Sequence, residues 1–297
     1  MTTFTDVVED VLSTMRGTVR SQEQSTYLTT AVDDSELVWS VANAGRLAPG
    51  RAECGDELIY LDQFSVVDST VTIAPYGRGI DGTTAAIHDL NAQIVSNPRF
   101  PKVRVRNAIN DTIRGVAGQL FTVSTTSITT TSDAISYELP ATTINVVGVT
   151  YETSDTRWVE LGSWRFNPNA DATDYPSGKS LSIGYTAPDL AVEVTCLTYP
   201  VPFDTDSDTL LTEVGLPESC RDVIVLGACW RLLSTIDIGE ISNSAISSAD
   251  LDNARGPGRT GGEGMTAATT IYKMFQMRLA EERKKLLDIY PSRIHYS

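Results

Sequence analysis

The chain has 297 residues and a formal net charge of −15, because 38 aspartate and glutamate residues outnumber 23 lysine and arginine residues. Proteins that bind nucleic acid usually have basic surfaces, since contacts to phosphates supply most of their affinity. The charge therefore argues against a dedicated nucleic-acid ligand. With 41% hydrophobic and 21% charged residues, the chain is predicted to fold as one large domain or two.

No apolar run reaches the roughly 18 residues of a membrane-spanning helix. The first residues carry acids where a signal peptide has basic ones, so we expect a cytosolic product with no membrane partner. The four cysteines form no CxxC pair and only two histidines occur, so neither zinc nor a disulfide framework is expected. We therefore expect no cofactor, and we expect the thiols of Cys54, Cys196, Cys220 and Cys229 to be buried and structural. The two histidines are His88 and His295.

The first third of the chain alternates helical and strand patterns. Apolar residues recur at helical spacing from Phe4 to Met15, which predicts a short N-terminal helix. Short β-branched and aromatic runs between residues 26 and 94 predict several short strands. After Pro98 and Pro101 the helical spacing returns and predicts a helix near 101–117.

The remaining segments are predicted to form strands first and then two helices, and no internal repeat of fixed period is visible. Thr-rich and β-branched runs between turn signals over 119–203 predict an antiparallel sandwich or barrel. A proline at position 217 precedes a helix near 217–236 that is apolar on most faces and must be buried. A polar, Gly-rich linker over 242–264 leads to a long C-terminal helix near 266–290.

These elements predict an α+β fold with a helical core and inserted antiparallel β-sandwich or barrel regions. Residues 1–98 would hold the N-terminal helix and a small β region. Residues 99–118 and 204–297 would form the helical core, and 119–203 an inserted antiparallel β domain.

Each motif that suggests a catalytic or binding site lacks the neighbouring residues or elements that such a site requires. Residues 256–261 match the letters G-x-G-x-x-G, but no strand precedes them, so a linker is the better interpretation. Gly178-Lys179-Ser180 resembles the end of a phosphate-binding loop, but Thr173 stands where its first glycine belongs. His88 is the one candidate base away from the C-terminal tail, and no G-x-S-x-G turn accompanies it. We therefore expect no enzyme activity.

Charge is unevenly distributed along the chain. Four basic residues, Arg99, Lys102, Arg104 and Arg106, cluster before and within the second helix, and Arg114 follows them. Acids dominate 204–222, beginning with Asp204, Asp206 and Asp208. Solvated faces are one interpretation of both stretches, and complementary patches on neighbouring copies of the subunit are the other. The C-terminal helix ends in a basic group, a candidate contact for an acidic partner.

Three stretches together resemble the head-to-tail adaptor, or neck, proteins of tailed bacteriophages. They are Tyr76-Gly77-Arg78-Gly79-Ile80-Asp81-Gly82-Thr83-Thr84-Ala85-Ala86-Ile87-His88, then Asn97-Pro98-Arg99-Phe100-Pro101 before the second helix, and Leu216-Pro217 before the third. In the first stretch Gly79 and Gly82 would permit turn dihedrals closed to other residues. Thr83 would begin a return strand, and Arg78 and His88 would tie the corner through hydrogen bonds.

The resemblance implies a structural virion protein without catalysis. Such adaptors form a ring, usually of twelve subunits, between the capsid portal and the tail, and double-stranded DNA passes through without specific binding. The charged residues above would then lie at subunit boundaries, and residues 255–264 would be an adjustable joint. The portal would contact the C-terminal end, through Arg283, Lys284, Lys285, Tyr290, Arg293 and Tyr296. Downstream neck or tail proteins would be further partners, and the protein would occupy the virion neck after assembly in the host cytoplasm.

A carbohydrate-binding β-module of a tail-associated receptor-binding protein is the alternative. It rests on Trp158 and Trp164 in a Thr-rich β region, since exposed aromatic rings stack on sugars. Their spacing of six predicts one shared strand face, and a buried core face is favoured over a sugar platform.

Overall fold

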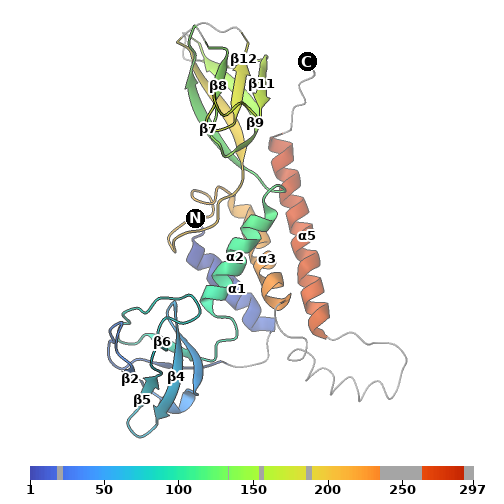
Figure 1. The fold of residues 1–297 in the computed structure, drawn as a ribbon. Coiled ribbons are helices and arrows are strands. Elements are labelled where there is room, and N and C mark those ends of the chain that lie inside the picture. Colours follow the sequence, from blue (N-terminus) through green and yellow to red (C-terminus); the bar gives the residue numbers. More distant parts are fainter. Residues whose placement is uncertain (19–22, 133, 154–156, 185–188, 235–262, 291–297) are drawn as a thin grey trace, which may run out of the picture. The chain divides into compact units, whose positions relative to one another are not determined.

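The computed structural model of the chain describes residues 1–18, 23–132, 134–153, 157–184, 189–234 and 263–290 (Figure 1). The chain divides into two compact units. One comprises Met1–Val7, Asn110–Gly227 and Thr269–Ser297, and the other comprises Val8–Ile109 and Ala228–Ala268. The linker expected over 242–264 and the joint at 255–264 lie outside the described residues, except for the helix start at Glu263.

A six-stranded antiparallel sheet forms the unit built on Val8–Ile109. Its order is β1-β6-β3-β4-β5-β2. The strands are β1 (Gln24–Tyr27), β2 (Val38–Ser40), β3 (Gly50–Cys54), β4 (Glu57–Ser65), β5 (Thr70–Ile73) and β6 (Gln93–Ser96). One face of the sheet buries a hydrophobic cluster that includes Trp39, Ile59, Leu61, Ile73 and Ile94.

The two outer strands of this sheet are joined to each other. The Thr29 amide donates to Ser40 O and the Ala42 amide donates to Tyr27 O, both at 2.9 Å. An antiparallel bridge between Leu28 and Val41 lies among these bonds. The sheet therefore curls round until its edges satisfy one another, which removes the open edges that promote pairing between chains.

Two smaller antiparallel sheets lie in the other unit. The four-stranded sheet has the order β10-β9-β13-β7, and the three-stranded sheet has the order β11-β12-β8. The strands are β7 (Thr122–Thr129), β8 (Ser136–Glu138), β9 (Thr143–Glu152), β10 (Trp158–Glu160), β11 (Trp164–Asn167), β12 (Ser180–Ile183) and β13 (Ala191–Thr198). Both sheets contribute to one hydrophobic cluster, with Val149, Val194 and Cys196 from the first and Leu181 and Ile183 from the second.

Four α-helices occur in the described residues: α1 (Phe4–Thr18), α2 (Lys102–Val116), α3 (Arg221–Ser234) and α5 (Glu263–Ile289). They begin and end close to the segments where helical spacing predicted helices. Short 3-10 turns are η1 (Ala44–Arg46) and η2 (Glu218–Cys220), the latter leading into α3. α2 and α5 bury one apolar stripe each, through Ile109 and Ile113 and through Phe275 and Leu279.

The prediction of an α+β fold with a helical core is wrong. The described chain is mostly β, with thirteen strands in three antiparallel sheets. The two sheet regions have hydrophobic clusters of their own, so they are not appendages of a helical core. Helical periodicity is visible within one short window, whereas the pairing that turns short strands into sheets joins distant residues and leaves no such local pattern.

All four cysteines are buried and free. Burial raises the pKa of the Cys54, Cys220 and Cys229 thiols to about 12. In the described part of the chain, no group of three or more histidine, cysteine or acidic side chains could hold a metal ion. Across the same residues, none of the helices combines the length and apolar character that a membrane crossing requires.

Gly227 allows α3 to pack closely against two other helices. A Cβ atom at this position would overlap the Thr112 side chain on α2 and lie 2.9 Å from Phe275 Cε2 on α5. Both neighbours are buried. Close packing leaves no room for the extra carbon, so any larger residue must push these side chains out of place.

We predict that Gly227→Val lowers the free energy of unfolding by about 1–3 kcal/mol or more, because overpacking strains a close-packed contact. Chemical denaturation measures the change. The matched control is Gly115→Ala on the exposed side of α2, which should leave stability unchanged or raise it by up to about 1 kcal/mol through helix propensity. Equal stability of Gly227→Val and the wild type would contradict the close contact.

Candidate functional site

The stretch from Tyr76 to His88 follows β5 and forms no helix or named strand. It lies beside β4, where the Tyr60 amide donates to Gly77 O at 2.7 Å and the Ile80 amide donates to Leu58 O at 3.0 Å. Gly79 has a φ of +60°, and a Cβ there would lie 2.7 Å from Ala85 N. Gly82 also has a positive φ, of +86°. The return strand expected to begin at Thr83 is not formed. Instead the Thr83 hydroxyl donates to Ile80 O at 2.8 Å and accepts from the Leu58 amide at 3.0 Å, which ties the corner to β4.

The Glu57 carboxylate, at the start of β4, lies at the centre of this corner. It is 1% exposed. Arg78 donates to both of its oxygens, at 2.6 and 2.9 Å, and His88 Nε2 lies 2.8 Å from Oε2. Because an ionised carboxylate only accepts, the histidine is the donor in this pair. The backbone amides of Gly79 and Ala86 complete the set, at 3.0 and 3.2 Å.

Burial by itself raises the pKa of Glu57, but the hydrogen bonds from His88, Arg78 and the Ala86 amide more than offset it. The resulting pKa is about 2, against an ordinary value of 4.5. The carboxylate is therefore held in its charged form. Such a buried charge is tolerable only when its partners are complete.

Arg78 also fastens the corner to the residues before β2. Its guanidinium donates to the carbonyl oxygens of Asp33, Glu36 and Ala86, at 2.9, 3.0 and 2.7 Å. It lies 4.8 Å above the Trp39 ring, and that ring meets His88 edge-on at 5.5 Å. Arg78 and His88 thus bind the same buried carboxylate and hold the corner together.

Glu57 was not singled out from the sequence. Its neighbours Leu58 to Leu61 are typical of a strand, so an acid at the strand start has the appearance of a turn residue. The available signal was the pair Arg78 and His88 in one short segment, since two buried cationic or donor side chains require an acceptor.

We predict that Glu57→Gln lowers the free energy of unfolding at pH 7 by about 3–5 kcal/mol, the usual cost of removing one partner from a buried ion pair. Because the native pKa lies below the unfolded value, the stabilisation is present above about pH 4.5 and is lost as the pH falls towards 2. The difference between wild type and variant should shrink over that window. Denaturation at several pH values measures it.

Asp81→Asn is the matched control, because Asp81 pairs with Arg51 at 3.2 Å on the exposed surface. Exposed pairs contribute about 1 kcal/mol at most. A loss in the Glu57 variant no larger than in this control would contradict the central role of the carboxylate.

The basic residues expected at a subunit boundary lie around the start of α2, beside acids of the same unit. The Arg99 amide donates to Glu23 Oε1 at 3.0 Å, and the Lys102 amide donates to Glu53 Oε1 at 2.6 Å. Arg106 pairs with Asp56 at 3.2 Å. Arg104 is exposed. Part of this positive charge is thus matched within the chain.

The acidic residues Asp204, Asp206 and Asp208 belong to the other unit. Asp208 accepts hydrogen bonds from the hydroxyl and amide of Thr205 and from the Asp204 amide, which lower its pKa. The Phe4 amide donates to Asp208 O at 2.9 Å and the Thr5 hydroxyl to Asp206 O at 3.3 Å. Asp208 organises its own loop, while the Asp204 and Asp206 side chains are exposed.

Glu53 is a buried acid that caps α2 through the Lys102 amide. Burial raises its pKa to about 7, against the lowering effect of the Lys102 amide and charge. A raised native pKa means that its contribution is fully present below about pH 4.5 and is lost as the pH rises through 7. Above that pH the buried carboxylate is charged, which lowers the free energy of unfolding.

We predict that Glu53→Gln, which keeps the oxygen acceptor and removes the charge, is more stable than the wild type at pH 8 by on the order of 2 kcal/mol. The two should converge at pH 4.5. Denaturation at both pH values tests this, and Asp62→Asn, at an exposed acid on β4 of the same unit, is the control. A difference that is the same at both pH values would show that Glu53 does not titrate in this window.

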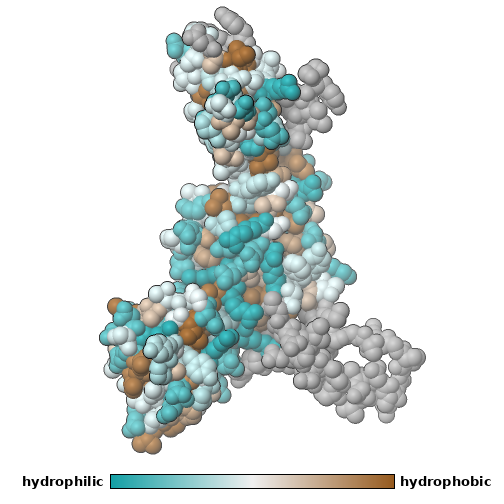
Figure 2. Space-filling model, in the orientation of Figure 1, coloured by the Kyte–Doolittle hydropathy of each residue, from teal (hydrophilic) through white to brown (hydrophobic). Residues whose placement is uncertain are grey.

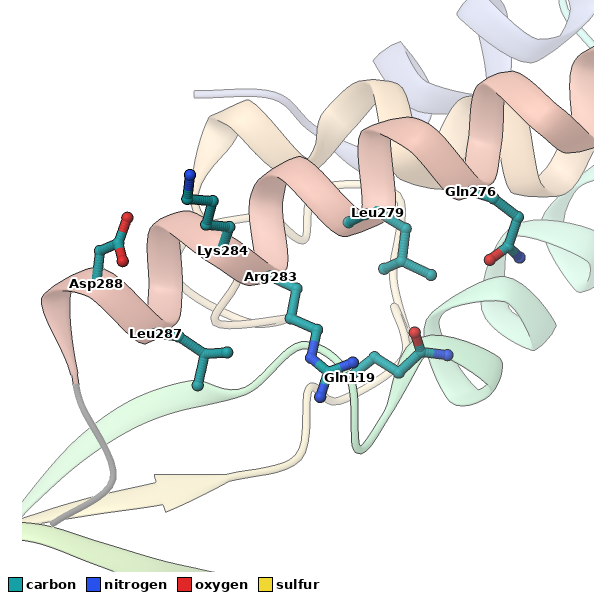
Figure 3. Close-up of a pocket in the computed structure, with 8 residues that line it drawn as sticks. Gln119, Gln276, Leu279, Arg283, Lys284, Leu287 and Asp288 are labelled. Carbon is teal, nitrogen blue, oxygen red and sulfur yellow. The ribbon is translucent and has the colours of Figure 1, made fainter.

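The C-terminal half of α5 combines basic and apolar side chains beside two hollows. The first, of about 370 Å³, is lined by Gln119, Gln276, Leu279, Ala280, Arg283, Lys284, Leu287 and Asp288 (Figure 3). In Figure 3 Arg283 extends towards Gln119, whereas Lys284 and Asp288 point away from it. The second hollow, of about 380 Å³, is also lined by Arg283 and includes Phe121, Leu197 and Tyr290.

The expected portal residues differ in their surroundings. Lys285 pairs with the buried Glu282 at 2.5 Å, and Glu282 also accepts from Ser219 at 2.6 Å. Lys284 and Arg283 are exposed and Tyr290 is half-buried. Arg293 and Tyr296 lie outside the described residues. Lys285 is thus partly committed to α5 itself, whereas Arg283 and Lys284 face solvent.

The two tryptophans of the sugar-binding alternative do not share a strand face. Trp158 belongs to β10 and is 44% exposed, whereas Trp164 belongs to β11 in the other sheet and packs against the hydrophobic cluster. A chain reversal between them breaks the period of two on which the expectation rested.

The comparisons with known proteins agree with the resemblance noted in the sequence. No curated protein matches the chain. A family model described as SU10 adaptor protein matches residues 83–276, about two thirds of the chain. The matched span contains part of the corner after β5, α2, both smaller sheets, α3 and the first half of α5. The chain therefore belongs to the SU10 adaptor protein family, a family of head-to-tail adaptors of tailed bacteriophages.

Proposed function

We propose that the chain is a non-catalytic subunit of a ring, of twelve copies, that joins the capsid portal to the tail in the virion neck. Family membership supports a structural adaptor of the phage particle. The observation that carries the proposal is the end of α5, where exposed Arg283 and Lys284 adjoin Leu287, itself 41% exposed, and two hollows. A basic rim round an apolar recess suits an acidic, helical or extended segment of a partner protein.

The partner proposed for this surface is the portal protein, with assembly taking place in the host cytoplasm. Of the six residues expected there, Arg283 and Lys284 are the best targets for mutation, because Lys285 is already paired with Glu282. Rim charges mainly change the association rate and the salt dependence of binding, so both quantities report on them.

Double-stranded DNA is proposed to pass through the ring without specific binding. The net charge of −15 per copy supports this, because acids near a channel repel a phosphate backbone and reduce friction during packaging and ejection. The ring would then act as a conduit.

Downstream neck or tail proteins are proposed to contact the unit with the six-stranded sheet. Several apolar side chains of this unit reach solvent, including Val66, Val67 and Tyr76, and the last two are 94% and 99% exposed. Apolar residues at the surface of both β regions are visible in Figure 2. Exposed apolar groups are typical of surfaces that a partner covers.

We predict that the double variant Arg283→Glu and Lys284→Glu binds purified portal at least about tenfold more weakly than the wild type, since each change turns attraction into repulsion at the rim. Binding of each variant to surface-immobilised portal is measured at two salt concentrations and gives the affinity. Lys273→Glu, an exposed charge reversal nearer the start of the same helix, is the matched control and should bind normally.

Electron microscopy of the wild-type chain with portal counts the copies round the symmetry axis. Unchanged affinity of the double variant would contradict the assignment of the α5 end. Absence of any ring on the portal would contradict the proposed function as a whole.

A further inference from the structure

β7 is a long sheet edge without the usual protection. It has eight residues, TVSTTSIT, with no charge, no proline and no glycine. In the described residues its backbone bonds only to β13. Natural proteins usually protect such an edge with charges, prolines, bulges or short strands, because an open edge pairs readily with another strand.

β10 is the opposite edge of the same four-stranded sheet, and all three of its residues are exposed. Trp158 is 44% exposed and Val159 is 42% exposed. Within the part of the chain that the structure describes, β10 pairs only with β9, so its two adjacent apolar side chains suit a partner strand. The two edges therefore complement each other: β7 has backbone groups that can pair with a strand, and β10 has apolar side chains that a neighbour can bury.

The strand directions decide how copies can join. Every pair in β10-β9-β13-β7 is antiparallel, so with four strands the two edges run in opposite directions. β10 of one copy placed beside β7 of the next would continue the antiparallel order without interruption. In the three-stranded sheet the outer strands β11 and β8 run in the same direction, so the same step would require a parallel pair. The edges of the six-stranded sheet already bond to each other.

The register also keeps the two faces of the sheet consistent. Val159 stands opposite Tyr151, which stands opposite Val192 and then Ile128, and Val192 is fully buried. Ile128 and Val159 thus lie on the face that covers the hydrophobic cluster. Glu160, Thr150, Glu193 and Ser127 form the next row, on the outer face. An added β10 would extend both faces as they are.

We propose that β7 of one copy pairs with β10 of the next copy, so that the four-stranded sheets of neighbouring subunits join head to tail. This inference rests on the proposed ring, and it names the contact that would build it. A contact between two different surfaces generates a closed ring or a filament, whereas β7 pairing with itself would stop at a dimer.

Cysteine cross-linking in the full chain tests this pairing. Glu160→Cys is combined in turn with Thr125→Cys, Ser127→Cys or Thr129→Cys, which scan the outer face of β7 in steps of two. Within one copy these positions are three strand spacings apart, about 14 Å, and a disulfide needs Cα atoms within about 7 Å. The native thiols are buried, so mild oxidation should reach only the introduced ones.

We expect one of the three double variants, mixed with portal and oxidised, to give a ladder of covalent multimers that collapses to monomer on reduction. The variants with a single introduced cysteine are the matched controls and should remain monomeric on the same gel. Electron microscopy of each unoxidised sample establishes that rings have formed and that the substitutions are tolerated.

Rings without a ladder in any of the three registers would overturn the pairing and leave the proposed function standing. Dimers from a single β7 cysteine would overturn it in favour of a two-fold contact. No rings from the wild type on portal would defeat the proposed function, and the pairing with it.

Discussion

The unit with the six-stranded sheet depends on the hydrogen bonds and the ion pair that the buried Glu57 carboxylate forms. Residues 74–87 form no strand or helix, so their polar groups need partners from elsewhere. The carboxylate supplies two oxygens to five donors, and Arg78 passes the restraint on to Asp33 and Glu36 before β2. One charged group thereby positions both residues 74–87 and the residues before β2. This matters because β2 is the outer strand that is joined to β1 and closes the sheet.

Closure divides the molecule into a self-contained sheet and an open one. In the six-stranded sheet, backbone bonds join residues next to β1 and β2, so its edges need no further strand. The four-stranded sheet has no such bond across the described residues. The proposed pairing of subunits uses the two edges of the four-stranded sheet, whereas closure keeps the edges of the six-stranded sheet from pairing with other chains.

The local features could be predicted from the sequence, and the long-range ones could not. Apolar spacing placed the helices within a few residues, because a helix needs only neighbours three and four positions away. Arg78 and His88 were recognised as corner residues, but their shared acceptor Glu57 lies more than twenty positions away and looks like a turn residue. The fold is mostly β because the short strands pair into three sheets. A short stretch of sequence does not indicate which strands pair. Likewise the basic residues from Arg99 to Arg106 suggested a solvated face or a patch that meets a neighbouring copy. In the structure Arg106 pairs with Asp56, and the Arg99 and Lys102 amides donate to Glu23 and Glu53, acids from a distant part of the chain.

The buried thiols have a consequence for how long an assembled particle lasts. A pKa of about 12 for Cys54, Cys220 and Cys229 leaves a thiolate fraction of roughly 10⁻⁵ at neutral pH, and the thiolate is the form that oxidants attack. These thiols should therefore remain largely unchanged when the protein is exposed to aerated water. Oxidation would then begin elsewhere, for example at the exposed thioethers of Met274 and Met277, which need no ionisation to react.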